Sequence, residues 1–476
     1  MPILKLIMLL CPLEIYSMKF TGSQLVWLFK KAAIAVGIIL ILLLLFWPTS
    51  KQNMDGKIHL RYWYATGQKE EIPYHVKLFN QTHDSIVVKA VPIPWQESEK
   101  KVLTAVLSGN PPDIVDQFVP VVKWASRLAL IPLDSFIIKD HFDTSVIFPA
   151  LLREMKYDGR IFALPTATVS YALFYNKKLF RQAGLDPQKP PRTWNEVKEY
   201  SKRLLKKDRD GHITQMGFIF YLGRKLTASQ QTNEPALLMA WEKGVSFINK
   251  RGDKINLVNK EMIEIIKWIL EAQKDYSLND LLSFTAGFGY GDQHAFISEK
   301  VAMMVLGCNF PDNIARYAPD LDYGVAIIPT FEGCPTASPS GSWWMGIPRG
   351  AKNAQAAWQF IKYATDKNVQ LKSIKAMDES LFPANRLAAN DPSFLTSKAN
   401  KIFLKEIEFA HSQSIVPLAH DVFWREFYSA LERIMFGKQS PAASLGQAQQ
   451  IIQQELNQAI NYDHYVREHI HFPGAG

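Results

Sequence analysis

Alternating strand-like and helix-like segments between residues 58 and 116 constrain the fold of this chain more than any other feature. The motif Ser108-Gly109-Asn110-Pro111-Pro112 stops the second helical segment with one glycine and two prolines. The segments in order are a strand at 58–64, a helix at 74–80, a strand at 85–91, a helix at 97–107 and a strand at 113–116. This order predicts a parallel sheet covered by helices, and therefore an α/β fold.

Chain length and further helical patterns indicate more than one structural unit. At 476 residues the chain exceeds what one hydrophobic core usually supports, so we expect two lobes. A composition of 47% hydrophobic and 21% charged residues is typical of a folded protein. Thr193 and Glu196 have the spacing of a capping box at a helix start. Three further helical stretches are expected at 353–365, 401–437 and 445–465.

The net charge of the chain is positive, but its distribution does not suggest nucleic acid. Lysine and arginine total 54 against 45 acidic residues, which gives a formal charge of +9. These cations are spread thinly, and no compact basic run with interleaved aromatic residues occurs. We therefore expect no nucleic-acid partner. A basic surface beside an anionic membrane explains the charge equally well.

An apolar run near the N-terminus predicts a membrane anchor. Residues 32–47, AAIAVGIILILLLLFW, carry no charge and are near the lower length limit for crossing a bilayer. Lys30 and Lys31 favour an N-terminus that stays in the cytoplasm. No A-x-A cleavage pattern follows, so we expect a retained anchor through residues 32–50 rather than a cleaved signal peptide. Met18 is an alternative start of the chain.

Three cysteines are too few for a disulfide framework. Cys11 precedes the apolar run, whereas Cys308 and Cys334 both follow it. In an oxidising compartment these two can form one bridge, and two unpaired thiols are the alternative.

The sequence contains no recognisable catalytic or metal-binding motif. Neither G-x-S-x-G nor H-E-x-x-H occurs, and the glycine-rich segment 287–291 lacks the Lys-Ser/Thr of a phosphate-binding loop. Asp113 and Asp116 are close in sequence, which does not place them across a glycosidic bond. We therefore predict a protein that is not an enzyme and needs no metal or cofactor.

A series of short motifs occurs in a recognisable order between about residues 57 and 390. Phe162 and Phe174 stand where tyrosine is usual in such motifs, and Val245 and Glu299 stand where glycine is usual. The motifs are Ser108–Asp113, Leu130–Asp134, Asp158–Pro165, Tyr171–Lys177, Pro190–Glu196, Trp241–Gly244, Glu299–Met304, Tyr323–Pro329, Gly341–Ile347 and Ala356–Phe360. In this order the chain resembles the extracellular solute-binding proteins of sugar ABC transporters, a maltose-binding-protein-like family.

The resemblance implies a two-lobed periplasmic-binding-protein fold with an N-terminal transmembrane helix. Residues 1–56 would form a cytoplasmic stub and the anchor. The first lobe would comprise residues 57–169 and 341–390, and the second residues 170–340 and 391–476 with the C-terminal helices.

The resemblance also implies a sugar-binding cleft between the lobes. Aromatic rings would cover the apolar faces of the sugar, and a few polar groups would fix its hydroxyls. The expected ligand-binding residues are Trp63, Gln117, Tyr171, Trp241, Asn309, Phe310, Trp343, Trp344 and Arg386. Trp63 is expected at the end of the first strand, where parallel sheets present ligand-facing loops. Trp343 and Trp344 would point in opposite directions on a strand, so only one would face the cleft.

The function implied is the capture of a carbohydrate for import by ABC transporter permease subunits. The lobes would lie in the periplasm or another extracytoplasmic space, and the single-pass anchor in the cell membrane. A membrane-tethered ligand sensor for a signalling partner would use the same cleft and is the alternative. The sequence does not specify the sugar or its length.

Overall fold

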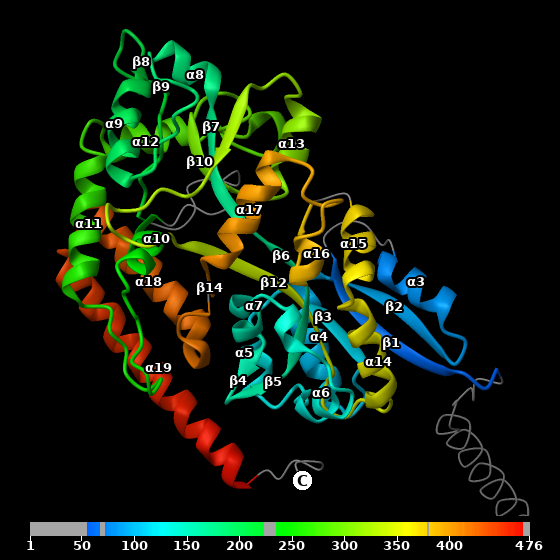
Figure 1. The fold of residues 1–476 in the computed structure, drawn as a ribbon. Coiled ribbons are helices and arrows are strands. Elements are labelled where there is room, and N and C mark those ends of the chain that lie inside the picture. The colour runs from blue at the N-terminus through cyan, green and yellow to red at the C-terminus, as the bar shows by residue number, and fades with distance from the viewer. Residues whose placement is uncertain (1–54, 67–71, 223–234, 378–379, 413, 470–476) are drawn as a thin grey trace, which may run out of the picture. The chain divides into compact units, whose positions relative to one another are not determined.

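The computed structural model describes residues 55–66, 72–222, 235–377, 380–412 and 414–469 (Figure 1). Residues 57–476 group into one unit by their contacts, and residues 1–56 into another. The predicted anchor at residues 32–50 lies outside the described residues. Across the described ranges, none of the helices combines the length and the apolar character needed to cross a bilayer.

A seven-stranded sheet forms the centre of the first lobe. Its strand order is β13-β6-β12-β3-β1-β2, with β14 beside β12. Strands β1, β2 and β3 are parallel, whereas β12 runs antiparallel to β3 and to β6. The strands are β1 (Ile58–Thr66), β2 (Ile86–Pro94), β3 (Ile114–Gln117), β6 (Ala163–Val169), β12 (Ser338–Gly346), β13 (Phe382–Pro383) and β14 (Ala410–Ser412). The predicted strand–helix–strand order between residues 58 and 116 is confirmed.

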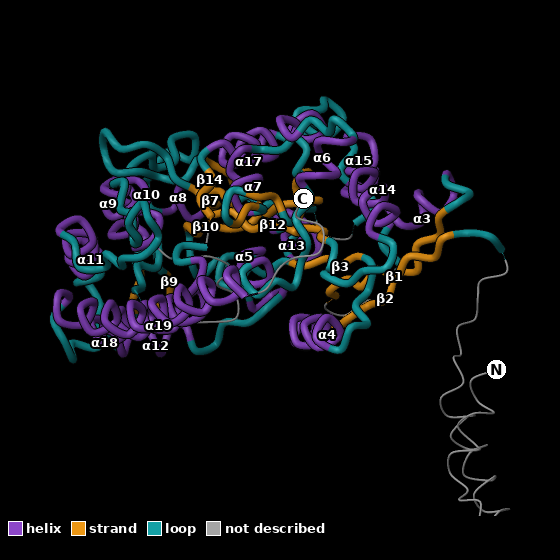
Figure 2. The backbone as a smooth tube through the Cα atoms, turned by 90° about the horizontal axis from the view of Figure 1, so that it is seen from below, coloured by secondary structure: helices purple, strands orange, loops and turns teal. Residues whose placement is uncertain are grey.

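Helices cover both faces of this sheet, as the alternation of buried side chains requires. Tyr62 of β1 is fully buried, and its ring lies 5.9 Å from His75 of α3 and 5.6 Å from Phe360 of α14. Helix α4 lies on the opposite face of the sheet (Figure 2). There Ser98 donates a hydrogen bond to the side chain of Gln117. The helices of this lobe are α3 (Tyr74–Thr82), α4 (Trp95–Leu107), α5 (Val121–Ala125), α6 (Asp134–Lys139), α7 (Pro149–Glu154), α14 (Ala354–Ala364), α15 (Lys367–Lys375) and α16 (Arg386–Ala389).

The second lobe is built around a smaller antiparallel sheet with the order β10-β7-β11. Phe174 of β7 is fully buried there and stacks on Tyr323 at a ring distance of 5.9 Å. The strands are β7 (Tyr171–Asn176), β10 (Met303–Gly307) and β11 (Tyr323–Ala326). The main helices are α8 (Lys177–Gln182), α9 (Trp194–Leu204), α10 (Pro235–Glu242), α11 (Lys260–Ala272), α12 (Leu278–Thr285), α13 (Phe310–Tyr317), α17 (Lys398–Glu408), α18 (His420–Met435) and α19 (Pro441–His469).

Most of the predicted helices are present, with one correction. The capping box of Thr193 and Glu196 opens α9 as expected. The stretch predicted as helical from 401 to 437 is two helices, α17 and α18, separated by strand β14. Residues 410–412 leave the helix because they pair in parallel with residues 338–340 of β12. Helices α18 and α19 then lie side by side (Figures 1 and 2).

The two cysteines that follow the apolar run are both free thiols, so the Cys308–Cys334 bridge considered from the sequence is not formed. Cys308 is 4% exposed, and this burial raises the pKa of its thiol to about 12. Cys308 is therefore a protonated, unreactive core residue at neutral pH.

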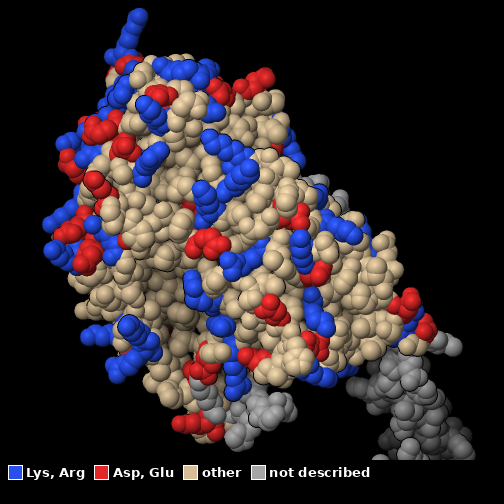
Figure 3. Space-filling model, viewed as in Figure 1, with Lys and Arg blue, Asp and Glu red and all other residues tan. Residues whose placement is uncertain are grey.

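Charged side chains of both signs alternate over the face of the molecule shown in Figure 3. Lysine and arginine side chains lie next to aspartate and glutamate over most of this face, so the described residues on it present no broad area of one sign. Proteins that bind nucleic acid independently of its sequence do so through a broad positively charged area.

Two buried glutamates hold the segment that leads into β12. Glu242 accepts hydrogen bonds from the Trp194 indole at 2.9 Å and from the Phe331 amide at 3.0 Å. Glu406 accepts one from the Ile328 amide at 2.6 Å. Glu242 is 2% exposed and Glu406 is fully buried. Burial raises the pKa of each carboxyl to about 8, so both are largely protonated at neutral pH.

The raised pKa of Glu406 predicts a loss of stability with rising pH. An acid whose pKa rises on folding contributes fully below its unfolded value, here 4.5, and the contribution is lost as the pH passes about 8. The free energy of unfolding should therefore fall between pH 6 and pH 9. In Glu406→Gln the fall should be smaller by about 1–3 kcal/mol, because the amide cannot ionise.

Denaturant unfolding of the purified protein at the two pH values measures both quantities. Glu261→Gln, at an exposed position of α11, serves as the matched control and should keep the pH dependence of the unmodified protein. An equal fall in Glu406→Gln and in the unmodified protein would contradict the assignment.

Candidate ligand-binding site

Three aromatic rings meet at the edge of the larger sheet where its parallel strands end. Trp95 follows β2 directly, Phe118 follows β3 directly, and Trp343 belongs to β12. The ring centres lie 4.8 Å apart for Trp95 and Trp343, 5.6 Å for Phe118 and Trp343, and 6.1 Å for Trp95 and Phe118. All three side chains are partly exposed. We call these three residues the aromatic cluster.

The pairing of the strands explains why the cluster forms. Trp344 pairs with Gln117, the last residue of β3, so Trp343 lies beside the residue that follows the strand, Phe118. The carboxyl ends of parallel strands share one edge, which brings Trp95 to the same place. Mutually tilted rings of this kind present apolar surface to a ligand while supporting one another.

Successive side chains of β12 point to opposite faces of the sheet. Trp344 is 1% exposed, packs edge-on against Trp124 and donates its indole N–H to the carbonyl of Val119 at 2.7 Å. Trp343 points the other way, toward the aromatic cluster. The prediction that the two tryptophans diverge is confirmed, and Trp344 belongs to the core.

A second pair of rings lies beside β12, on the side of Trp343. His411 of β14 pairs with Pro339 of β12, and parallel partners share a face of the sheet. Pro339 is four residues from Trp343, so both point to the same side. His411 stacks on Trp241 of α10 at 5.0 Å with an angle of 13° between the rings.

Tyr171 and Asn309 both lie next to the point where the chain passes from β6 to β7. Tyr171 opens β7 one residue after Ser170, and the amide of Cys308 donates to the carbonyl of Ser170 at 2.8 Å. Asn309 follows Cys308 and precedes α13, and its side chain makes no capping hydrogen bond. Both residues therefore adjoin the backbone hydrogen bond between Cys308 and Ser170.

Two of the expected ligand-binding residues, Trp63 and Gln117, pack within the first lobe. Trp63 was expected at the end of the first strand, but β1 continues to Thr66 because its ladder with β2 runs on to Pro94. Trp63 is packed against the core in the middle of the strand. Gln117 is at the strand end as expected, but it is 1% exposed and its side-chain oxygen accepts the Ser98 hydroxyl at 3.2 Å.

Two further expected residues are occupied by other contacts. Phe310 is 1% exposed and packs on Phe174 in the core of the second lobe at 5.6 Å. Arg386 forms an ion pair with Glu408, 3.7 Å between Nη2 and Oε1, and lies over the ring of Phe148. The sequence motif around Arg386 gave no sign of either partner.

Trp95, Phe118 and His411 were not predicted. A signal for Phe118 was present, since the reasoning that selected Gln117 at the end of β3 applies equally to the next residue. Trp95 follows β2 in the same way, but its position depended on where that strand ends. His411 could not be found, because the stretch around it was predicted to be helical.

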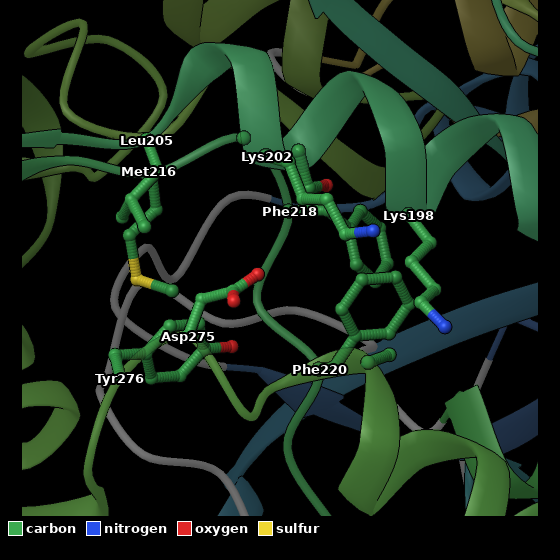
Figure 4. A pocket seen from close by; sticks show the side chains of 11 residues that line it. Lys198, Lys202, Leu205, Met216, Phe218, Phe220, Asp275 and Tyr276 are labelled. Atoms are coloured by element: carbon green, nitrogen blue, oxygen red, sulfur yellow. The ribbon is translucent and has the colours of Figure 1, made fainter.

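The pocket shown in Figure 4 lies elsewhere, within the second lobe. Lys198 and Lys202 of α9 and the rings of Phe218, Phe220 and Tyr276 line it, and it has room for about one water molecule. It is too small for a sugar. Within the ranges that the structure describes, no group of three or more His, Cys, Asp or Glu residues is placed to hold a metal ion.

Known proteins resemble this chain over most of its length. The galactooligosaccharide-binding protein of Bacillus subtilis is 23% identical over 84% of this chain and 90% of its own. The sn-glycerol-3-phosphate-binding periplasmic protein UgpB of Brucella melitensis is 25% identical over 67% of this chain and 73% of its own.

Solved structures show the same architecture. CpMnBP1 with mannotriose bound is 27% identical and has a TM-score of 0.68, covering 83% of this chain and 100% of its own. The sugar-binding protein MalE from Xanthomonas citri, at 18% identity and a TM-score of 0.70, shares the fold over 87% of this chain and 100% of its own.

The family described as bacterial extracellular solute-binding protein matches residues 65–371, which is more than half of the chain. This agrees with the family predicted from the ordered motifs. The chain belongs to the bacterial extracellular solute-binding proteins.

Proposed function

We propose that this protein captures a neutral carbohydrate outside the cytoplasm and delivers it to the permease subunits of an ABC transporter. The observation that carries the proposal is the aromatic cluster of Trp95, Phe118 and Trp343 at the carboxyl edge of the parallel strands, in a member of a solute-binding family. A mannotriose-bound structure at 27% identity supports a carbohydrate ligand. The relatives are named as binding proteins, which does not favour the sensor alternative.

The chemistry of the proposed site suits a sugar. The aromatic cluster would cover the apolar C–H faces of one or more rings, and Tyr171, Trp241, Asn309 and His411 would approach from the second lobe. None of these seven residues is a lysine or arginine, so the set favours a neutral ligand over the phosphate ester named for the UgpB relative. Gln117, Phe310 and Trp344 are left out of the proposed set because they are buried, and Arg386 because it is paired with Glu408. Trp63 is left out because it lies within β1 and not at its end.

The proposed lobe boundaries follow the two sheets, except that residues 338–340 of β12 and all of β14, which belong to the larger sheet, fall in the second lobe. The first lobe would comprise residues 57–169 and 341–390, and the second residues 170–340 and 391–476. β6 ends at Val169 and β7 begins at Tyr171, which supports a hinge at Ser170. Ligand would bind between the lobes and close them without any chemical step.

The aromatic cluster predicts a selective loss of sugar binding when one ring is removed. Trp343→Ala should weaken mannotriose binding by about 1–3 kcal/mol, because the ligand loses a large apolar contact. Trp268→Ala removes a partly buried tryptophan outside the proposed site and should leave binding unchanged. Calorimetry on purified protein with mannotriose and a panel of neutral oligosaccharides provides the measurement. Equal effects of both substitutions, or turnover of the sugar, would argue against the proposal.

The proposed hinge predicts a ligand-dependent change of shape. Small-angle scattering of the unmodified protein should show a smaller radius of gyration with saturating mannotriose than without it. Trp343→Ala at the same sugar concentration should stay closer to the unliganded value. A radius unaltered by a sugar that calorimetry shows to be bound would contradict closure.

We also propose that residues 32–50 stay in the mature protein as a single-pass anchor. The support is the charge-free run, Lys30 and Lys31 before it, and the missing cleavage pattern. The protein isolated from its native membranes should therefore contain peptides from before residue 50 in mass spectrometry. A mature chain that begins after residue 50 would show that the segment is a cleaved signal.

A further inference from the structure

Gly341 lies on β12 at the point where the ring of Phe118 crosses the strand. A Cβ atom at position 341 would lie 2.5 Å from Cζ and 3.1 Å from Cε2 of Phe118. Carbon atoms in contact stay about 3.5–4 Å apart, so no side chain fits there while the ring is in place. The backbone of Gly341 lies outside the left-handed region, so alanine would be acceptable at this position on conformational grounds.

The strand cannot move aside to make room for a side chain. Ser340 and Ser342, on either side of Gly341, both donate hydrogen bonds from their hydroxyls to the carboxylate of Glu154. The carbonyl of Gly341 accepts the Thr168 hydroxyl at 3.1 Å, and Gly341 pairs with Val169 of β6. Because β12 is held on one face and along one edge, a substitution at 341 must displace the ring.

The ring of Phe118 cannot move without disturbing the other two rings. It contacts Trp343 at 5.6 Å and Trp95 at 6.1 Å. Its main chain is bounded by Gln117, which pairs with Trp344, and by Val119, whose carbonyl accepts the Trp344 indole. Because the main chain around Phe118 is fixed, a colliding side chain at position 341 can be avoided only by rotation of the Phe118 side chain. Such a rotation would take the ring out of the aromatic cluster.

We propose that Gly341 is a positioning residue for the ligand. Because glycine has no side chain, the ring of Phe118 can lie directly against the strand at position 341, a contact that we call the seat. This contact fixes the arrangement of the aromatic cluster. The proposal rests on the proposed function for its effect on sugar binding. Its effect on the rings themselves is independent of any ligand.

A double-mutant cycle tests the proposal on the purified full-length chain. The variants are Gly341→Ala, Phe118→Ala and the double variant, with mannotriose binding measured by calorimetry. Gly341→Ala should weaken binding at least fivefold. In the Phe118→Ala background it should change binding less than twofold, since no ring remains to be displaced. Additive effects of the two substitutions, or unchanged binding in Gly341→Ala, would overturn the proposal.

Near-ultraviolet circular dichroism without ligand gives the second readout. Gly341→Ala should alter the aromatic spectrum, whereas adding Gly341→Ala to Phe118→Ala should not alter it further. Gly287→Ala is the matched control, because a Cβ atom at position 287 meets nothing within 4 Å and its φ is not positive. An identical spectrum in Gly341→Ala and the unmodified protein would refute the seat, even if no sugar binds.

The cycle also covers a failure of folding. If Gly341→Ala alone does not fold, the double variant should recover the folded far-ultraviolet spectrum, because the collision is with the Phe118 ring. A double variant that also fails to fold would overturn the proposal. If the unmodified protein binds no sugar but the spectra behave as expected, the proposed function fails while the seat stands.

Discussion

The alternation of side chains along β12 is the constraint on which the rest of the structure depends. On one side of the strand, Ser340 and Ser342 bind Glu154 and Trp344 fills the core. On the other side, Gly341 and Trp343 face the aromatic cluster. One strand therefore fixes the first lobe internally and presents the candidate site, and a shift by one residue would exchange the two roles.

Much of the fold follows from local sequence, whereas the site follows only in part. The order of strands and helices up to Gln117 was predictable because each segment has its own periodicity and stop signals. The opposite directions of Trp343 and Trp344 followed from strand geometry alone. Trp63 was misplaced because the end of β1 depends on its ladder with β2, which no local pattern reveals. The burial of Phe310 could not be predicted, because it arises against Phe174, a distant residue in the sequence.

Glu242 and Glu406 show how the second lobe positions the strand that enters the first. Both carboxyls accept backbone amides of the segment before β12, so this loop is held from two helices. Burying a carboxyl is costly unless it is protonated or well bonded. The raised pKa of each group reflects this cost, and the bonds to Ile328 and Phe331 offset part of it. The cost of burying the two carboxyls thus accompanies a fixed position of the segment that leads into β12.

The pairing of β14 with β12 has a consequence for the order in which the chain folds during synthesis. The larger sheet takes its first strand from residue 58 and its last from residue 412, so it stays incomplete until nearly the whole chain has left the ribosome. Until then, residues 338–340 of β12 have an open edge, the kind of surface that pairs with other chains. Such distant pairing slows folding. A nascent chain interrupted before residue 410 therefore carries an exposed strand edge beside its crossing between lobes.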